Sequence, residues 1–122
     1  QAWHFDGMDF VVLLYLTTPD GGGELECASL VRTDDDPCYD KVAAAFDGSY
    51  PQLHRRVPKA GTLTIMRGHH SVHRVTPVEG VTPRLTAVLA YDRVPEKREG
   101  DAINIQIYGE RIRTKIASGF NR

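Results

Sequence analysis

The stretch Phe10-Val-Val-Leu-Leu-Tyr-Leu16 is a continuous apolar run of bulky and β-branched side chains. A run of this kind, bounded by turn residues, is typical of a buried strand. Turn signals follow in residues 18–23, which read Thr18-Pro19-Asp20 and then three glycines. The next segment, residues 24–31, alternates in part between apolar and polar side chains. The pattern therefore predicts a β-hairpin with a glycine-rich connection.

Short strand-like segments recur along the rest of the chain. Turn residues come at short intervals, and the segments between them are rich in Val, Leu, Ile, Thr and Tyr. Strands are predicted over residues 62–66, 71–76 and 85–91, whereas residues 103–109 fit either a strand or a helix. Many short strands between frequent turns predict a mainly β fold, either a sandwich or a barrel.

One short helix is predicted, from about Tyr39 to Phe46. Asp36 is expected to cap its amino end, and Pro37 is expected at its first position, where a missing N–H costs nothing. Gly48 is expected to end it. Because the helix is short, we expect it to lie at the periphery of the β core.

The composition limits the classes of function. The chain has 122 residues, of which 41% are hydrophobic and 25% charged, as is ordinary for one globular domain. Lys and Arg number 15 against 16 Asp and Glu, so the chain lacks the basic excess typical of proteins that bind nucleic acid or anionic membranes. Its apolar runs are too short to span a bilayer, and two cysteines, Cys27 and Cys38, cannot form a disulfide framework. We expect a cytoplasmic domain that binds neither nucleic acid nor membranes.

The triplet His4-Phe5-Asp6 places an imidazole and a carboxylate two residues apart. On a strand, the side-chain period of two sends His4 and Asp6 to the same face. A further imidazole, His73, lies on a predicted strand, and ten residues separate it from Arg84. Two histidines and one carboxylate form the facial triad that binds Fe(II) and leaves positions open for other ligands. Arg84 offers a planar, permanently charged group suited to a carboxylate.

These four residues, with Gly61-Thr62-Leu63 ahead of the distal strand, resemble the signature of the iron(II)/2-oxoglutarate-dependent dioxygenases. The resemblance implies a double-stranded β-helix, or jelly-roll, core with one short helix. It implies that His4, Asp6 and His73 bind Fe(II) and carry the catalysis. It also implies that Arg84 holds the far carboxylate of the cosubstrate 2-oxoglutarate, and that dioxygen is the oxidant.

Further motifs resemble one bacterial subgroup of that family, the free-amino-acid hydroxylases and radical halogenases. These motifs are Trp3-His4-Phe5-Asp6, residues 22–26, Arg67-Gly68, residues 71–77, Tyr91-Asp92 and Ile107-Tyr108-Gly109. In the halogenases a small residue replaces the metal-binding carboxylate and makes room for chloride. Because Asp6 keeps the carboxylate, the resemblance implies hydroxylation of an unactivated C–H bond, with release of succinate and CO2. The substrate it implies is a small molecule, for example a free or carrier-bound amino acid.

Five more residues are candidates for contact with the substrate or for orienting a metal ligand. They are Trp3, Arg67, His70, Asn104 and Tyr108. Trp3 points away from His4 on a strand, so a place in the core or at its rim is the simpler interpretation. Arg67, beside the Gly68 turn, could line the pocket, and His70 could orient a ligand. Asn104 and Tyr108 lie in a segment that could fold over the mouth of the barrel.

Other polar residues have a plain structural interpretation. His69 and His70 follow the predicted turn at Gly68, so we expect solvated loop positions. Arg74 should face opposite His73 and serve a structural role. Glu24 and Glu26 share a strand face, and we expect them on a solvated hairpin edge.

Two alternative functions stay open at this stage. The same iron site could end its reaction in desaturation, cyclisation or epoxidation, because that outcome depends on how the substrate lies. A non-catalytic, cupin-like barrel that binds a metal or a small ligand is the other alternative, because one fold can serve many functions. The cupin-like alternative leaves Arg84 without a role.

The position of the H-x-D motif bears on the extent of the domain. In the family that the chain resembles, this motif follows the second core strand, but here it begins at His4. We therefore expect residues 1–122 to be the C-terminal catalytic part of a dioxygenase domain in a longer chain, without its N-terminal strand and bracing helices. The missing N-terminal part would then be a partner for an exposed sheet edge.

Overall fold

The computed structural model describes residues 1–98 and 100–113, and within them the side chains of all but residues 107 and 108. The elements of this part, in chain order, are β1 (Phe10–Tyr15), β2 (Gly21–Gly22), β3 (Leu25–Ala28), α1 (Tyr39–Asp47), β4 (Leu53–Arg56), β5 (Leu63–Met66), β6 (Val72–Val75), β7 (Val78–Glu79), β8 (Thr86–Tyr91) and α2 (Asp101–Tyr108). The expectation of a mainly β chain is confirmed.

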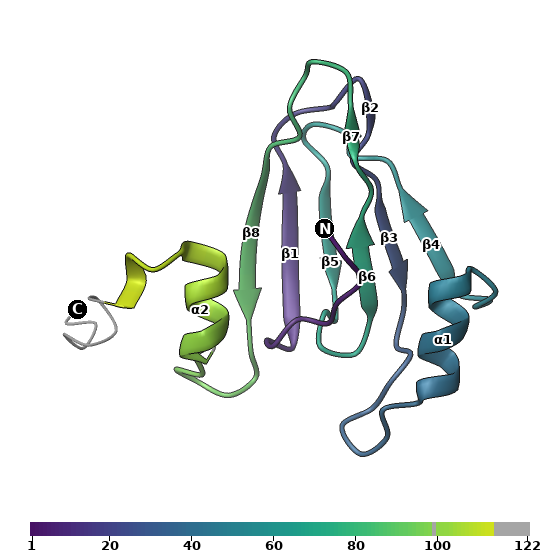
Figure 1. Cartoon of the computed structure of the whole chain (residues 1–122), viewed down its shortest axis with the longest axis vertical. Helices are drawn as coiled ribbons and strands as arrows, with labels where there is room; N and C mark the ends of the chain where they lie inside the picture. The colour runs from purple at the N-terminus through teal and green to yellow at the C-terminus, as the bar shows by residue number, and fades with distance from the viewer. Residues whose placement is uncertain (99, 114–122) are drawn as a thin grey trace.

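Two three-stranded antiparallel sheets hold the main core between them (Figure 1). One has the order β5-β1-β8 and the other the order β4-β3-β6. Alternate residues of β1, namely Val11, Leu13 and Tyr15, are buried and pack against Leu25 and Cys27 of β3. The period of two along β1 therefore gives one strand face to this core.

The predicted hairpin between residues 10–16 and 24–31 is wrong. β1 pairs with β5 and β8, whereas β3 pairs with β4 and β6, so the two segments belong to different sheets. The glycines between them carry the chain from one sheet to the other, and β2 pairs with β7 on the way. Gly22 and Gly23 have φ values of 60° and 63°, a left-handed conformation that glycine adopts without strain. The turn residues were identified correctly, but they connect two sheets.

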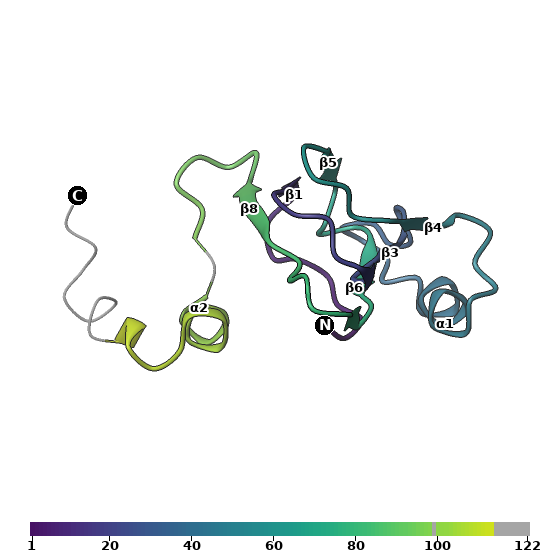
Figure 2. The ribbon, with the colours of Figure 1, turned by 90° about the horizontal axis from the view of Figure 1, so that it is seen from above.

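The predicted helix is confirmed as α1, which covers the outer face of the β4-β3-β6 sheet (Figure 2). Ala45 of α1 packs there against Ala28 and Val72. Its amino end differs from the prediction, because Cys38, with φ 47° and ψ 53°, is the capping residue. Asp36 instead accepts a hydrogen bond from the Cys38 N–H at 2.8 Å, which stabilises the turn before the helix.

Gly48 ends α1 in the left-handed conformation, with φ 83°, as predicted. β4 was not predicted, because its sequence Leu-His-Arg-Arg lacks an apolar run and three of its four side chains are exposed. Residues 103–109, which fitted either type of element, lie largely in α2.

The outer face of the β5-β1-β8 sheet is apolar and largely open in the described part of the chain. Leu63 and Ile65 of β5 and Leu89 and Tyr91 of β8 are 45% to 64% exposed. Helix α2 stands to the side of β8 (Figure 1). None of the described helices has the length and apolar character needed to cross a membrane.

Candidate metal centre

The two histidines and the aspartate singled out by their sequence pattern converge in space. Each of His4, Asp6 and His73 offers one ligand atom, and these atoms lie within 4.8 Å of one another. His73 Nε2 is 3.6 Å from Asp6 Oδ2, and His4 Nε2 is 3.8 Å from Asp6 Oδ1. Among the described residues, no other group of His, Cys, Asp and Glu side chains meets the same criterion.

The backbone brings these side chains together. His4 and His73 exchange two main-chain hydrogen bonds of 3.0 Å each, so residue 4 extends the β4-β3-β6 sheet at the edge of β6. Directly opposed residues of an antiparallel pair point to the same face, which places the two imidazole centroids 4.2 Å apart. The Asp6 N–H donates to the carbonyl of Gly68 at 3.1 Å, and this bond holds the Asp6 side chain on the same face as the two imidazoles.

Each imidazole is oriented by a carbonyl of its own chain segment. His4 Nδ1 lies 2.8 Å from the Ala2 carbonyl, and His73 Nδ1 lies 2.9 Å from the Ser71 carbonyl. A carbonyl can only accept, so both Nδ1 atoms donate, and each neutral ring carries its lone pair on Nε2. Both Nε2 atoms face Asp6, and the exposed Gln1 amide lies 3.2 Å from His4 Nε2. This arrangement is typical of histidines that bind metals.

The carboxylate of Asp6 sits in a space that only a glycine at position 68 allows. A Cβ at Gly68 would lie 1.8 Å from Asp6 Oδ2. The same oxygen is buried and has no hydrogen-bond partner within the described structure. An unpaired buried carboxylate oxygen is costly, and a cation beside it removes that cost.

His73 is 5% exposed, and burial lowers its pKa below the ordinary value of 6.5, although the Ser71 carbonyl and Asp6 act in the opposite direction. The neutral imidazole that a metal requires is therefore favoured. First-row metals bind nitrogen and oxygen ligands at about 2.0–2.2 Å, which leaves adjacent ligand atoms about 3 Å apart. The present separations are 3.6 and 3.8 Å, with all three ligand atoms within 4.8 Å, so these atoms would have to move closer together to hold such an ion.

Arg84 lies in a second group of unsatisfied polar atoms. Arg84 Nε, Tyr15 OH and Thr86 Oγ1 are buried, and no described residue forms a hydrogen bond with any of them. Tyr15 and Thr86 are opposite one another in the β1–β8 ladder, and the Arg84 guanidinium carbon is 5.3 Å from the centre of the Tyr15 ring. Gly23 leaves room for this arginine, since a Cβ there would lie 2.9 Å from Arg84 Cδ. A guanidinium and two hydroxyls are suitable donors for a carboxylate.

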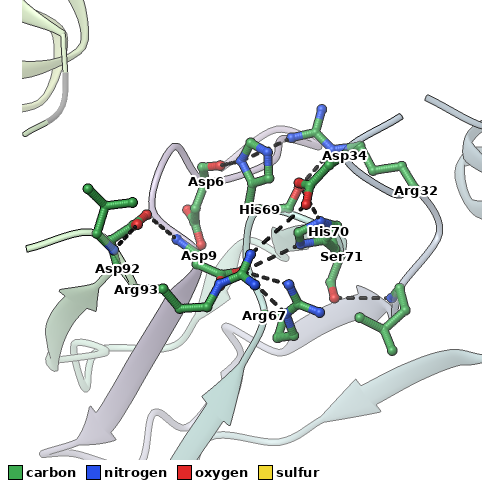
Figure 3. A network of polar contacts seen from close by, with 12 residues as sticks. Asp6, Asp9, Arg32, Asp34, Arg67, His69, His70, Ser71, Asp92 and Arg93 are labelled. Atoms are coloured by element: carbon green, nitrogen blue, oxygen red, sulfur yellow. Dashed lines mark hydrogen bonds and ion pairs between the residues drawn. The ribbon is translucent and has the colours of Figure 1, made fainter. Parts of the chain in front are cut away.

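Arg67 and His70 do not reach the three candidate ligands. Arg67 donates from Nε and Nη2 to one oxygen of Asp9, at 3.2 and 2.9 Å (Figure 3). His70 is 4% exposed, so the expectation of a solvated position is wrong. Its burial is stabilised by two carboxylates, because Nε2 lies 3.0 Å from Asp34 and Nδ1 lies 3.6 Å from Asp9.

His69 lies in the turn after Gly68, as expected, and is half-buried. Its Nδ1 lies 3.1 Å from the carbonyl of Asp6, and its own carbonyl accepts a hydrogen bond of 2.7 Å from Arg32 Nε. His69 therefore contacts the segment that carries the candidate ligand Asp6 (Figure 3).

A cavity of about 370 Å³ opens beside this segment. All but one of its lining residues are charged or are histidines: Asp9, Asp34, His69, His70, Asp92, Arg93, Val94 and Lys97. His69 lies between the cavity and the candidate ligands, because it lines the cavity and also contacts the backbone carbonyl of Asp6.

Trp3 and Arg74 lie away from the candidate ligands. Trp3 packs against the smaller core under α1, with its ring centroid 5.8 Å from that of Phe46. The Arg74 guanidinium lies 4.8 Å from the Trp3 ring centroid and binds Glu26, so its expected structural role is confirmed.

Glu26 is 3% exposed, which contradicts the expected solvated edge. It can be buried because Arg74 and Arg55, from the two neighbouring strands, both bind its carboxylate. Glu24 is half-buried and also contacts Arg55, at 3.3 Å.

The last two candidates belong to α2. Asn104 is half-buried, and its N–H donates to the carbonyl of Gly100 within the first turn of the helix. Tyr108 ends the helix, and its side chain lies outside the described part of the chain.

Three residues of these sites were missed in the sequence. Asp9 is a polar residue directly before the apolar run of β1, and that position alone could have drawn notice. Tyr15 continues the buried period-two pattern of Val11 and Leu13, so its hydroxyl could have been expected inside. Arg93 had no sequence signal, because its contact with Asp9 depends on the end of β8 lying beside the start of β1.

Comparison with known proteins adds no family assignment. The chain matches no model of a protein family, and its sequence matches no curated protein.

Proposed function

We propose that this chain is the catalytic part of an Fe(II)- and 2-oxoglutarate-dependent oxygenase that hydroxylates an unactivated C–H bond of a small molecule. The observation that carries the proposal is the convergence of His4, Asp6 and His73 from separate parts of the sequence, with their ligand atoms within 4.8 Å. The unsatisfied donors at Arg84, a separate buried group, support the cosubstrate in particular. A metal-binding barrel without this reaction would leave those donors without a role.

The geometry of the site supports a role for each residue. His4 and His73 would hold the metal through Nε2, while Nδ1 donation to carbonyls keeps both rings oriented. Asp6 would supply the anionic ligand. Arg84 would pair with the far carboxylate of 2-oxoglutarate, and the hydroxyls of Tyr15 and Thr86 would donate to the same group. When bound, iron, 2-oxoglutarate and dioxygen supply the oxidation itself, with succinate and CO2 as the cosubstrate products.

The cavity beside His69 supports a polar substrate. Its lining holds carboxylates from Asp9, Asp34 and Asp92 and cations from Arg93 and Lys97. A small molecule with charges of both signs, such as an amino acid, fits such a lining better than an apolar molecule does.

The arrangement of strands supports a double-stranded β-helix. Two antiparallel sheets face one another across one core, and the bridge between His4 and His73 adds a fourth chain segment to the β4-β3-β6 sheet. The two cysteines, Cys27 and Cys38, are free thiols, which supports a location in the reducing cytoplasm.

Succinate release tests the function directly. The chain, supplied with Fe(II), 2-oxoglutarate and oxygen, should release succinate when the correct member of a panel of amino acids and related metabolites is present. Arg84→Gln should abolish most of this release, whereas Arg56→Gln, which alters an exposed arginine of β4, should not. A product that gains one oxygen atom supports hydroxylation, and a product that loses two hydrogen atoms would show desaturation. Equal succinate release by the Arg84 variant would contradict the assigned cosubstrate site.

A further inference from the structure

Asp9 is a charged residue buried at the start of β1, only three positions after the candidate ligand Asp6. It is 4% exposed. A carboxylate in such a place requires charged partners, since an unpaired buried charge costs several kcal/mol. Arg67 binds Oδ1 through two nitrogens, Arg93 Nε lies 2.5 Å from Oδ2, and His70 Nδ1 lies 3.6 Å from Oδ1 (Figure 3).

These cations also determine the charge of Asp9. Burial alone would raise the pKa of its carboxyl, but hydrogen bonds and positive charge from Arg67 and Arg93 more than offset this effect. The pKa therefore lies below the ordinary 3.8, and the side chain stays ionised. Neither the proposed metal site nor the proposed cosubstrate site uses this cluster, although Asp9, His70 and Arg93 also line the cavity beside His69.

The cluster joins the two chain segments that form the cradle of Asp6. Residues 6–9 and 67–70 run beside each other and are tied at four points, one of which is the contact of His70 with Asp9 given above. The Asp6 N–H donates to Gly68 O at 3.1 Å, His69 Nδ1 lies 3.1 Å from Asp6 O, and Arg67 holds Asp9. The Asp9–Arg67 contact and the Asp6–Gly68 contact therefore hold the chain on the two sides of the Arg67–Gly68 peptide bond.

The direction of the effect follows from how each segment is anchored. The main chain of Asp9 is fixed independently, because its N–H donates to Asp92 Oδ2 at 3.2 Å and β1 begins at the next residue. The Asp9 side chain therefore acts on Arg67, and through it on Gly68. Gly68 in turn touches the Asp6 carboxylate closely enough that an added Cβ would lie 1.8 Å from it.

We infer that Asp9 is a positioning residue for the metal-binding carboxylate: by holding Arg67 it keeps the Gly68 turn against Asp6 and so keeps Asp6 in place for the ion. This inference rests on the proposed metal centre. It assigns to Asp9 a role that neither the H-x-D spacing nor the position of Arg84 contains.

The test compares Asp9→Asn with a matched control, Glu26→Gln. Glu26 is also a buried carboxylate held by two arginines, but it lies on the strand face opposite Cys27, the cross-strand partner of His73. Co²⁺ is titrated into each form of the 122-residue chain, and urea unfolding is measured in parallel. Substitution of a residue that supports a metal ligand typically lowers metal affinity by about 10- to 100-fold. Asp9→Asn should weaken Co²⁺ binding by about 10-fold, whereas Glu26→Gln should lose stability without a comparable loss of affinity.

Two additions keep the test decisive. Arg67→Lys keeps the positive charge but loses the two-nitrogen contact, so it should weaken Co²⁺ binding by a few-fold even if Asp9→Asn does not fold. Amide hydrogen exchange at Asp6, measured without metal, should be faster in the Asp9 or Arg67 variant than in the unaltered chain, and unchanged in Glu26→Gln.

The outcomes separate the two ideas. If the unaltered chain binds no Co²⁺, the metal centre is wrong, and the exchange rate at Asp6 still decides whether Asp9 positions that residue. If the unaltered chain binds Co²⁺ and the Asp9 and Arg67 variants bind it equally well with unchanged exchange, the positioning role is overturned while the metal centre stands.

Discussion

Gly68→Ala is the substitution from which the structure predicts the sharpest effect on the metal centre. An alanine Cβ at this position would lie 1.8 Å from Asp6 Oδ2, 2.7 Å from Asp6 Cγ and 2.9 Å from Asp6 Cβ. Real Cβ atoms do not approach other atoms closer than 3.0 Å, so the Asp6 carboxylate must move by more than about 1 Å. The φ of Gly68 is not in the left-handed region, and the effect is therefore steric.

The magnitude has two parts. Inserting a methyl group into a packed site costs about 1–3 kcal/mol of unfolding free energy. A displacement of about 1 Å is half the length of a metal–oxygen bond, so Asp6 should no longer bind the ion well. We expect metal affinity to fall by about 100-fold, at the upper end of the range for disturbed ligand support.

The assay is a Co²⁺ titration together with urea unfolding, and Gly100→Ala is the control. Gly100 has no left-handed φ, and nothing lies within 4 Å of a Cβ added there. A second comparison uses Asp6→Ala as the background, where the two closest clashing atoms are gone. In that background Gly68→Ala should cost much less stability, because effects of contacting residues are not additive. Unchanged Co²⁺ affinity in Gly68→Ala, or the same stability cost in both backgrounds, would refute the proposed packing of Asp6 against Gly68.

Three further predictions concern the cosubstrate site, acid stability and the core. Arg84→Gln should weaken 2-oxoglutarate binding to the metal-loaded chain by about 30-fold or more, because loss of one partner of a buried charge pair costs about 2–5 kcal/mol. Tyr15→Phe, which removes one hydroxyl donor, should weaken this binding several-fold. Calorimetry that shows equal affinities for the variants and the unaltered chain would contradict this prediction. Hydrogen bonds from Lys97 and Val94 lower the pKa of Asp92 to about 2, so its stabilising effect is present above about pH 4 and is lost as the pH falls towards 2. Asp92→Asn should therefore flatten the decline of unfolding free energy over that pH range, as measured by urea unfolding. An equally steep decline in the variant would argue against the contact of Asp92 with Lys97. Leu13→Ala should lower the free energy of unfolding by about 2–5 kcal/mol, because Leu13 is 7% exposed in the core between the sheets, and a loss below about 1 kcal/mol would show that this core is poorly packed.

The strands could be predicted from the sequence because their signals are local. β1 and β8 are long runs of apolar and β-branched residues, and helix α1 ends at a glycine in the expected conformation. The pairing of strands could not be predicted in the same way. The glycine-rich turn after β1 is as compatible with a hairpin as with a passage between two sheets, and the choice depends on partners more than forty residues away, such as β5 and β8.

The candidate ligands could be predicted because His4, Asp6, His73 and Arg84 match, in residue type and spacing, the signature of the family that the chain resembles. The structure brings Asp6 to the two histidines through its N–H bond to Gly68 O, outside any strand. The buried carboxylates could not be predicted from the sequence, because a charged residue is buried only when distant residues supply opposite charges. Glu26 depends on Arg55 and Arg74, and Asp9 depends on Arg67 and Arg93.

Anaerobic addition of Fe(II) and 2-oxoglutarate tests the central claim most directly, because it requires neither a known substrate nor turnover. The chain should develop a visible charge-transfer band when the cosubstrate binds the iron held by His4, Asp6 and His73. Asp6→Ala and His73→Ala should each weaken that band strongly, while Glu26→Gln should retain it if the protein stays folded. The absence of a band from folded, unaltered protein, or a band of full strength in the Asp6 and His73 variants, would contradict the assignment of this site.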